Sequence, residues 1–171
     1  ESNLFIAGAA TKGFQAPGIR VGWVIASHDH IKTLGNFSSF GMGGVSRPSQ
    51  LYAEKLFNRD RTDLSFDAIP NYYSKQRDRY GNTFKEMGLE LFSGQGGFYH
   101  WCKLPRSLDA DYFNKQLFKY GAAILKGTDC DMRRMGARSS IKQFFRFSFG
   151  PLSDDSFKSD IQIIQEVLNN S

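Results

Sequence analysis

The stretch that decides the fold reads TKGFQAPGIRVGW and spans Thr11 to Trp23. It follows directly on one short apolar run, 4–10, and overlaps a second, 19–26. The small, β-branched and aromatic residues of both runs are typical of buried strands. The segment between them, residues 11–18, carries two glycines and a proline and is expected to be a loop. The sequence therefore predicts two strands joined by a loop that folds the chain back on itself.

Two cations flank this loop, and their chemistry suggests a site. Lys12 stands at the end of the first strand among small residues, where partial desolvation would free its amine to form an imine with an aldehyde or ketone. Arg20 starts the next strand, and its guanidinium can bind a phosphate through two hydrogen bonds. If the loop folds back, both cations face one anion. The alternative, from the residues alone, is a pair of ordinary surface cations beside a turn.

Outside this stretch, helical and strand patterns alternate. Helices are predicted at 27–40, 46–57, 66–87, 109–120 and 153–168, and strands at 97–104, 122–125 and 144–149. Glycines at 41–44 are interpreted as a helix stop rather than a phosphate loop, because they fit neither common phosphate-binding pattern. Alternating strands and helices predict an α/β or α+β fold.

The first region has too few strands to stand alone. Up to about residue 71 it supplies only two predicted strands, and two strands rarely form a stable sheet by themselves. We expect this region to be the tail of a larger sheet. Residues 72–171 contain enough elements for a small domain of their own.

A second candidate site residue lies on a late aromatic strand. Period-two alternation puts Phe145, Phe147 and Phe149 on one face of this strand, and Arg146 and Ser148 on the other. An arginine among phenylalanines is unfavourable to bury without an anion. Arg146 is therefore interpreted as an anion-binding residue, with a partly exposed arginine on an edge strand as the alternative.

The spacing of five residues resembles the Schiff-base signature of class I/II aminotransferases. That signature has Ser or Thr, Lys, five further residues, Gly, any residue, Arg, any residue and Gly, and it is matched here by Thr11, Lys12, Gly18, Arg20 and Gly22. Residues 96–101 are similar to the family's Gly-Gly-aromatic-aromatic-x-Trp strand, and residues 145–149 to the late strand whose arginine binds the substrate α-carboxylate. The resemblance extends from Leu4 to Leu168.

The resemblance implies an α/β chain of the type I fold, with residues 1–71 as the incomplete end of the large, pyridoxal-phosphate-binding domain. Residues 72–171 would be the α+β C-terminal small domain, and the helix at 66–87 would link the two. The implied cofactor is pyridoxal 5'-phosphate. The implied reaction moves an amino group between an amino acid and a 2-oxo acid, in a homodimer when the protein is complete.

The resemblance also implies roles for individual residues. Lys12 would be the Schiff-base lysine and the proton shuttle between the substrate Cα and C4′ of the cofactor. Arg20, with Thr11 close by, would hold the cofactor phosphate, and Arg146 would bind the substrate carboxylate. Arg47 could approach the partner subunit's site, which is a weaker implication.

The departures from the family pattern concern groups upstream of the lysine. Ala9 stands where the family often has a phosphate-binding serine. The family's Asp at the pyridine nitrogen, its Tyr and Asn, and the aromatic residue that stacks on the ring all lie far upstream, whereas eleven residues precede Lys12 here. We expect this chain to be the C-terminal portion of an aminotransferase and to be inactive, or nearly so, when isolated.

Three other functions remain open on the sequence. A β-lyase or synthase of the same fold would share the lysine and both arginines. RNA binding is suggested by the aromatic strand, Lys142 and the cluster Arg133, Arg134 and Arg138, although Gln143 stands where the RNA-binding pattern has glycine. The third is a non-catalytic remnant or binding domain.

Composition excludes several classes. The net charge of +5 suits an anionic ligand without selecting one. Two cysteines exclude a disulfide-rich scaffold, and three histidines without ligand-like company predict no metal site. The longest apolar run, 21–26, is far shorter than the roughly 18 residues of a membrane span. With so few cysteines and no membrane span, we expect a protein of the reducing cytoplasm with no membrane partner. The break in the RNA-binding pattern at Gln143 leads us to expect no nucleic-acid partner.

Overall fold

A computed structural model describes residues 3–105 and 108–170 of the 171-residue chain. The chain consists of two compact units, Glu1–Ile69 and Pro70–Ser171. Among the described residues, no helix is both long and apolar enough to cross a membrane.

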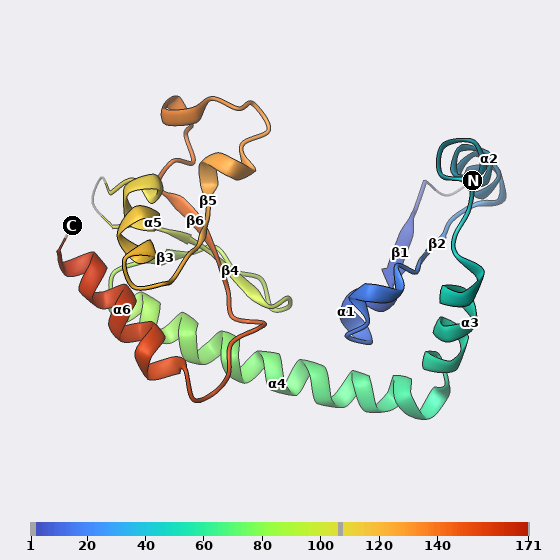
Figure 1. Cartoon of the computed structure of the whole chain (residues 1–171), viewed down its shortest axis with the longest axis horizontal. Helices are drawn as coiled ribbons and strands as arrows, with labels where there is room; N and C mark the ends of the chain where they lie inside the picture. Colours follow the sequence, from blue (N-terminus) through green and yellow to red (C-terminus); the bar gives the residue numbers. More distant parts are fainter. Residues whose placement is uncertain (1–2, 106–107, 171) are drawn as a thin grey trace. The chain divides into compact units, whose positions relative to one another are not determined.

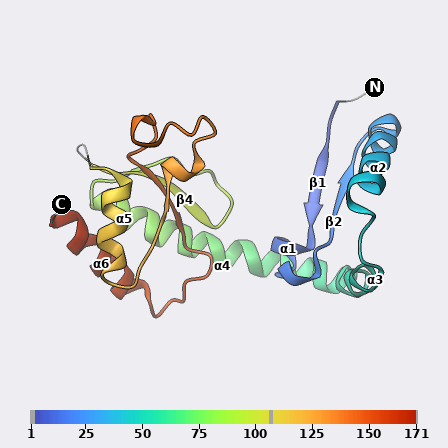
Figure 2. The same cartoon turned by 45° about the horizontal axis from the view of Figure 1, so that its top comes forward.

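The first unit contains a two-stranded antiparallel sheet. β1 (Ile6–Ala9) pairs with β2 (Gly22–Ile25), so that Ala9 lies opposite Gly22. Figure 2 shows the two strands side by side, with α1 at the end where the hairpin turns. Both predicted strands are confirmed, each shorter than the apolar run that predicted it.

The predicted loop is partly helical, which corrects the expectation of an irregular segment. It contains α1 (Ala10–Gly13) and a 3₁₀-helical turn, η1 (Pro17–Ile19). The N–H of Ala10 donates to the carbonyl of Val21 at 3.1 Å, and the N–H of Ala16 donates to the carbonyl of Ala10 at 3.1 Å. The first bond extends the pairing of the two strands, and the second closes the loop on itself. The helical turns satisfy backbone groups that a short loop would leave unpaired.

Two helices follow the hairpin. α2 (His28–Met42) ends where Gly43 adopts a positive φ of 71°, and α3 (Arg47–Leu56) comes next. Residues 41–44 thus act as a helix stop, as predicted, because glycine enters the left-handed region without strain. The ring of Phe57, just after α3, meets Phe14 and Trp23 edge-on, with centroids 4.8 and 5.1 Å apart.

The helix α4 (Arg59–Glu86) starts in the first unit and ends in the second. The sequence predicted its start near residue 66, which is wrong by about two turns. Asn58 accounts for the difference, because its side-chain oxygen accepts the N–H of Arg61 at 2.9 Å and so caps the first turn. That first turn is polar, so it carried no apolar periodicity.

The second unit is built on a four-stranded antiparallel sheet in the order β3-β4-β6-β5. Its strands are β3 (Glu90–Leu91), β4 (Tyr99–Lys103), β5 (Leu125–Lys126) and β6 (Phe144–Ser148). The sequence missed β3 because two residues are too few to show a period. It predicted a strand at 122–125, whereas only Leu125 of that run, together with Lys126, pairs with β6.

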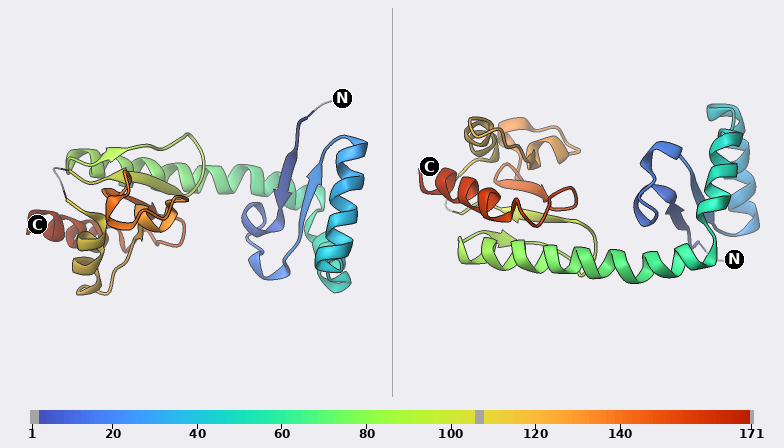
Figure 3. Two further views of the ribbon diagram at one scale, coloured as in Figure 1. Left: turned by 90° about the horizontal axis from the view of Figure 1, so that it is seen from above. Right: turned by 60° about the horizontal axis from the view of Figure 1, so that its bottom comes forward.

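Three helices supply the core on one face of this sheet: the second half of α4, α5 (Ala110–Phe118) and α6 (Phe157–Asn169). Fully buried rings come from the helices and from the sheet: Tyr80, Phe84, Phe113, Phe145 and Phe149. Figures 1 and 3 show α6 lying alongside α4. The predicted start of α6 at residue 153 is corrected to 157, because Ser153 caps a preceding turn by accepting the N–H of Ser156 at 3.3 Å.

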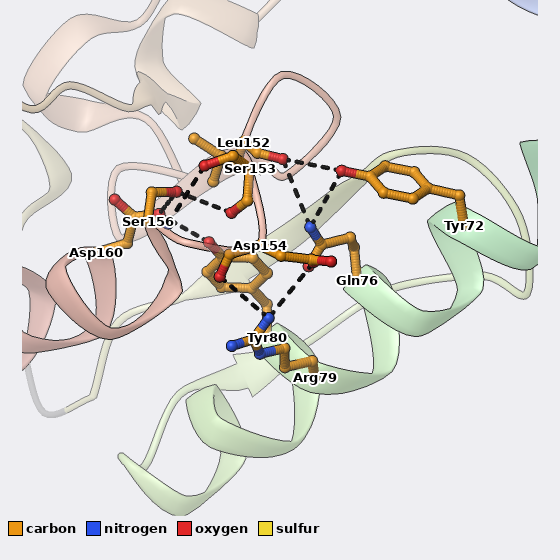
Figure 4. Close-up of polar contacts among 9 residues, drawn as sticks. All are labelled: Tyr72, Gln76, Arg79, Tyr80, Leu152, Ser153, Asp154, Ser156 and Asp160. Atoms are coloured by element: carbon orange, nitrogen blue, oxygen red, sulfur yellow. Dashed lines mark hydrogen bonds and ion pairs between the residues drawn. The ribbon is translucent and has the colours of Figure 1, made fainter.

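Polar contacts join α4 to the segment that leads into α6 (Figure 4). The hydroxyl of Tyr80 donates to Oδ2 of Asp160 at 2.7 Å, and the hydroxyl of Ser156 donates to the same oxygen at 2.9 Å. Nearer the middle of α4, the hydroxyl of Tyr72 donates to the carbonyl of Leu152 at 3.2 Å. The second unit is therefore held by a shared aromatic core and by this polar seam.

Candidate active site

Lys12 lies in α1, at the end of the hairpin formed by β1 and β2. Its side chain is exposed, and Thr11 beside it is half-buried. The sequence suggested that the end of an apolar strand would partly desolvate this amine. Within this chain it does not, because the strands β1 and β2 are themselves exposed. Lys12 is therefore exposed to solvent in this chain.

Arg20 lies on the same loop, between η1 and β2, in a left-handed conformation with φ of 54°. Its Nη1 donates to the carbonyl of Pro17 at 2.7 Å, so the guanidinium folds over its own turn. A guanidinium has five N–H donors, and this bond uses one of them. The loop thus carries a primary amine and a guanidinium that retains donors for an anion.

Arg146 belongs to the second unit and lies on β6, a strand with a neighbour on each side. Phe145, Phe147 and Phe149 are buried while Arg146 is exposed, so the predicted alternation of faces is confirmed. The alternative of an edge-strand arginine is wrong, since β4 and β5 flank β6. Arg146 lies opposite Trp101 on β4 and opposite Leu125 on β5.

The sequence did not identify Tyr99, which the structure places against Arg146. The Cζ atom of Arg146 lies 5.3 Å from the centroid of the Tyr99 ring. The alternation of β4, with His100 and Cys102 buried, could have assigned Tyr99 to the open face of the sheet. It could not have shown which residue of β6 lies beside it, because that depends on strand order and register.

The cluster of arginines after β5 is exposed. Arg133 and Arg134 lie between two 3₁₀-helical turns, η2 (Gly127–Cys130) and η3 (Gly136–Arg138), and Arg138 ends the second of these turns. Asp131 organises this segment. Its carboxylate accepts the N–H of Arg133 at 2.9 Å and that of Met135 at 3.3 Å. Hydrogen bonding, first from Ser139 and then from these N–H groups, lowers the pKa of Asp131 below its usual value. Asp131 thus ties together the backbone of this segment.

The histidines at the start of α2 and on β4 make contacts within the fold. Within the described residues, no group of three or more histidines, cysteines or acidic residues is placed to hold a metal ion. His30 contacts Ser27, with 2.8 Å between Nδ1 and Oγ, at the start of α2. His100 is buried and makes two hydrogen bonds, to Ser93 and to the carbonyl of Arg77. These contacts are structural.

Comparison with known families gives a match over most of the chain. The model described as "Aminotransferase class I and II" matches residues 1–158. The chain belongs to the class I and II aminotransferase family. The family resemblance found in the sequence is thereby confirmed.

Two curated relatives are aminotransferases. The LL-diaminopimelate aminotransferase of Halothermothrix orenii is 26% identical over 109 residues, which cover 64% of this chain and 28% of that protein. Aromatic-amino-acid aminotransferase 1 of Thermococcus litoralis is 22% identical over 156 residues, which cover 90% of this chain and 36% of that protein. The chain therefore spans about a third of the length of these relatives.

Solved aminotransferases share the fold. The kynurenine aminotransferase of Pyrococcus horikoshii matches 99% of this chain and 41% of its own chain, with a TM-score of 0.85 and 20% identity. The alpha-aminoadipate aminotransferase of Thermus thermophilus matches 97% of this chain with a TM-score of 0.83. The predicted α/β fold, part of a large-domain sheet followed by an α+β unit, is confirmed. The roles of Lys12, Thr11, Arg20 and Arg146 remain predictions.

Proposed function

We propose that the complete protein containing this chain is a pyridoxal-phosphate-dependent aminotransferase, which moves an amino group between an amino acid and a 2-oxo acid. We further propose that it acts as a homodimer in the cytoplasm and that this chain alone has little or no activity. The relatives support the reaction class through their names, and the structure of the P. horikoshii enzyme is described as a complex with PMP. The chain spans about a third of its curated relatives, so the rest of the site belongs to other parts of the protein.

One observation carries the proposal: Lys12 and Arg20 lie on a single loop between two paired strands. The pairing of β1 with β2 continues through the bond from Ala10 to Val21, so the loop has a fixed base. Reaction of an amine with a carbonyl group is faster when the carbonyl compound is held in place. A nearby guanidinium supplies that hold if the compound carries a phosphate.

The residues present fit pyridoxal phosphate in part. The cofactor has an aldehyde and a phosphate, and the loop offers the exposed amine of Lys12 and the uncommitted donors of Arg20 for these two groups. The hydroxyl of Thr11, next to Lys12, would add a donor for the phosphate. Groups that contact the ring of the cofactor would come from outside this chain.

The chemistry divides among these residues. When bound, pyridoxal phosphate supplies a ring that withdraws electrons from the substrate Cα. Lys12 Nζ is the nucleophile for the carbonyl group and the base that accepts the proton from the substrate Cα. Arg20 would orient the cofactor by binding its phosphate. Arg146 would bind the substrate α-carboxylate with the paired donors of its guanidinium. In the second unit, Arg146 is exposed on the open face of the sheet, where an anion can reach it.

The test is amino transfer by the complete protein, with formation of a new amino acid from an added 2-oxo acid as the measurement. Lys12→Ala should lower kcat by about three orders of magnitude or more, because it removes the nucleophile and the base together. Lys32→Ala is the matched control, since Lys32 is also an exposed lysine of the first unit. It should retain wild-type activity.

Other outcomes separate the alternatives. Release of ammonia and a 2-oxo acid without any amino acceptor would identify a lyase of the same fold. Full activity of Lys12→Ala would contradict the assignment of Lys12. Absence of any reaction with amino acids, in a protein that contains all of its chain, would favour a non-catalytic binding protein.

A further inference from the structure

We propose that Tyr99 is a positioning residue for the substrate: its ring holds the guanidinium of Arg146 in the orientation that receives the substrate carboxylate. The inference rests on the proposed function, because it concerns the arginine proposed to bind that carboxylate. It starts from the contact between the two side chains, in which Cζ of Arg146 lies 5.3 Å from the ring centroid of Tyr99. A cation over an aromatic face at this separation is attracted by the ring quadrupole.

Arg146 has few other restraints. Within the part of the chain that the structure describes, its guanidinium makes no ion pair and no hydrogen bond to another side chain. A long, exposed side chain with unused donors samples many rotamers, and ordering it on binding lowers affinity. A ring that already restricts the guanidinium reduces this entropic cost. Tyr99 is the neighbour that supplies such a ring.

Tyr99 is itself held firmly. The carbonyl of Phe98 accepts the N–H groups of Phe149 and Gly150, both at 3.1 Å, so the backbone is fixed just before Tyr99. Tyr99 then pairs with Ser148 across the sheet. Its ring meets the ring of Phe98 edge-on, with centroids 5.5 Å apart and planes at 89°. These contacts fix the platform on which the guanidinium rests.

The ring rather than the hydroxyl should carry the effect. Within the described residues, the Tyr99 hydroxyl has no hydrogen-bond partner, whereas the ring contacts both Phe98 and Arg146. Phenylalanine keeps the aromatic face and loses only the hydroxyl. Leucine keeps an apolar side chain but has no quadrupole. The two substitutions therefore separate a positioning ring from a polar contact.

The experiment uses the complete protein and measures KM and kcat for the amino donor. Tyr99→Leu should raise KM by about 3- to 30-fold, the range expected for loss of a cation–π contact between its exposed and desolvated limits. Its kcat should stay near the wild-type value, because a weakened carboxylate contact affects binding in the ground state and transition state alike. Tyr99→Phe should behave as the wild type.

A substrate without the carboxylate distinguishes positioning of Arg146 from a purely structural role of Tyr99, because a structural defect would affect both substrates alike. The amine that corresponds to the amino donor, lacking its α-carboxylate, should react equally well with wild type and Tyr99→Leu. The preference for the amino acid over this amine should therefore fall by the same factor as KM rises. Tyr112→Leu is the matched control, because Tyr99 and Tyr112 are each 44% exposed and Tyr112 lies on α5. It should leave this preference unchanged.

Two results would overturn the inference while leaving the proposed function intact. One is an active Tyr99→Leu protein with wild-type KM, and the other is an equal defect in Tyr99→Phe and Tyr99→Leu. If Tyr99→Leu did not fold, as judged by circular dichroism, Tyr99→Met would take its place with a similar side-chain volume. A wild-type protein without amino transfer would overturn the proposed function, and this inference with it.

Discussion

The described residues of the second unit bury a group of aromatic side chains between their sheet and helices, whereas residues 3–69 leave most of their large apolar side chains at least partly exposed. In the described part of the first unit, the buried residues are Ala10, Ala53 and Leu56, while Phe40 is 95% exposed. The second unit buries a continuous aromatic core. The difference follows from the sheets, since a two-stranded hairpin cannot cover its own faces but a four-stranded sheet with helices on one face can. Stability should therefore concentrate in the second unit.

Hydrogen exchange should show the largest contrast between the two units. Amides of β4 and β6 should exchange about 100-fold more slowly than those of β1 and β2, because buried elements open only by larger unfolding events. Mass spectrometry of peptides from the 171-residue chain would measure this. Equal exchange in the two sheets would contradict the comparison.

Removing a core ring should have the next largest effect. Phe145 is fully buried on β6, so Phe145→Ala should lower the free energy of unfolding by about 3 to 5 kcal/mol. Phe40→Ala, in the first unit, should change it by no more than about 0.5 kcal/mol, because that side chain is exposed. Urea unfolding followed by circular dichroism would measure both variants. Similar losses of unfolding free energy in the two variants would contradict the claim that the two units differ in stability because they differ in burial.

The polar seam in Figure 4 should contribute less than the core. Tyr80→Phe removes the hydroxyl that donates to Asp160 and should lower the free energy of unfolding by about 1.5 to 3 kcal/mol, as expected for a hydrogen bond to a charged group. Burial, followed by the bond to Asp160, raises the pKa of Tyr80. The folded state therefore retains this proton more strongly, and its stability should fall as pH rises above about 10. Tyr112→Phe should leave both the stability and this pH dependence unchanged.

The smallest effect on stability should come from protonation of His100. Burial lowers the pKa of His100, and the positive charge of Arg77 acts in the same direction, although a bond to the Arg77 carbonyl opposes it. The folded state binds this proton less readily than the unfolded state, so stability should be full above about pH 6.5 and decline as pH falls below it. His100→Gln should reduce this decline between pH 7 and 5, measured as the midpoint of thermal unfolding. His28→Gln, at an exposed position, should not alter it.

Features that depend on a single strand or helix were predicted best from the sequence. The alternation on β6 assigned Phe145 and Arg146 to opposite faces, because a period of two is a local property of a strand. The helix stop at 41–44 was also predictable, since glycine alone enters the left-handed region without strain.

Prediction failed where the outcome depends on distant residues or on polar caps. The contact of Tyr99 with Arg146 depends on the pairing of β4 with β6, which no local pattern encodes. The start of α4 depends on one capping side chain, Asn58, within a polar run. Lys12 is exposed because no other strand or helix of this chain, within the described residues, buries β1 and β2. The apolar sequence around Lys12 could not show this.

The central claim is that Lys12 forms the covalent link to pyridoxal phosphate, and reductive labelling tests it most directly. The complete protein would be incubated with the cofactor, reduced with borohydride, digested and mapped by mass spectrometry. We expect the label on Lys12, complete loss of that label in Lys12→Ala, and no change in Lys32→Ala. Labelling of the complete protein at another lysine, with Lys12 unmodified, would contradict the account.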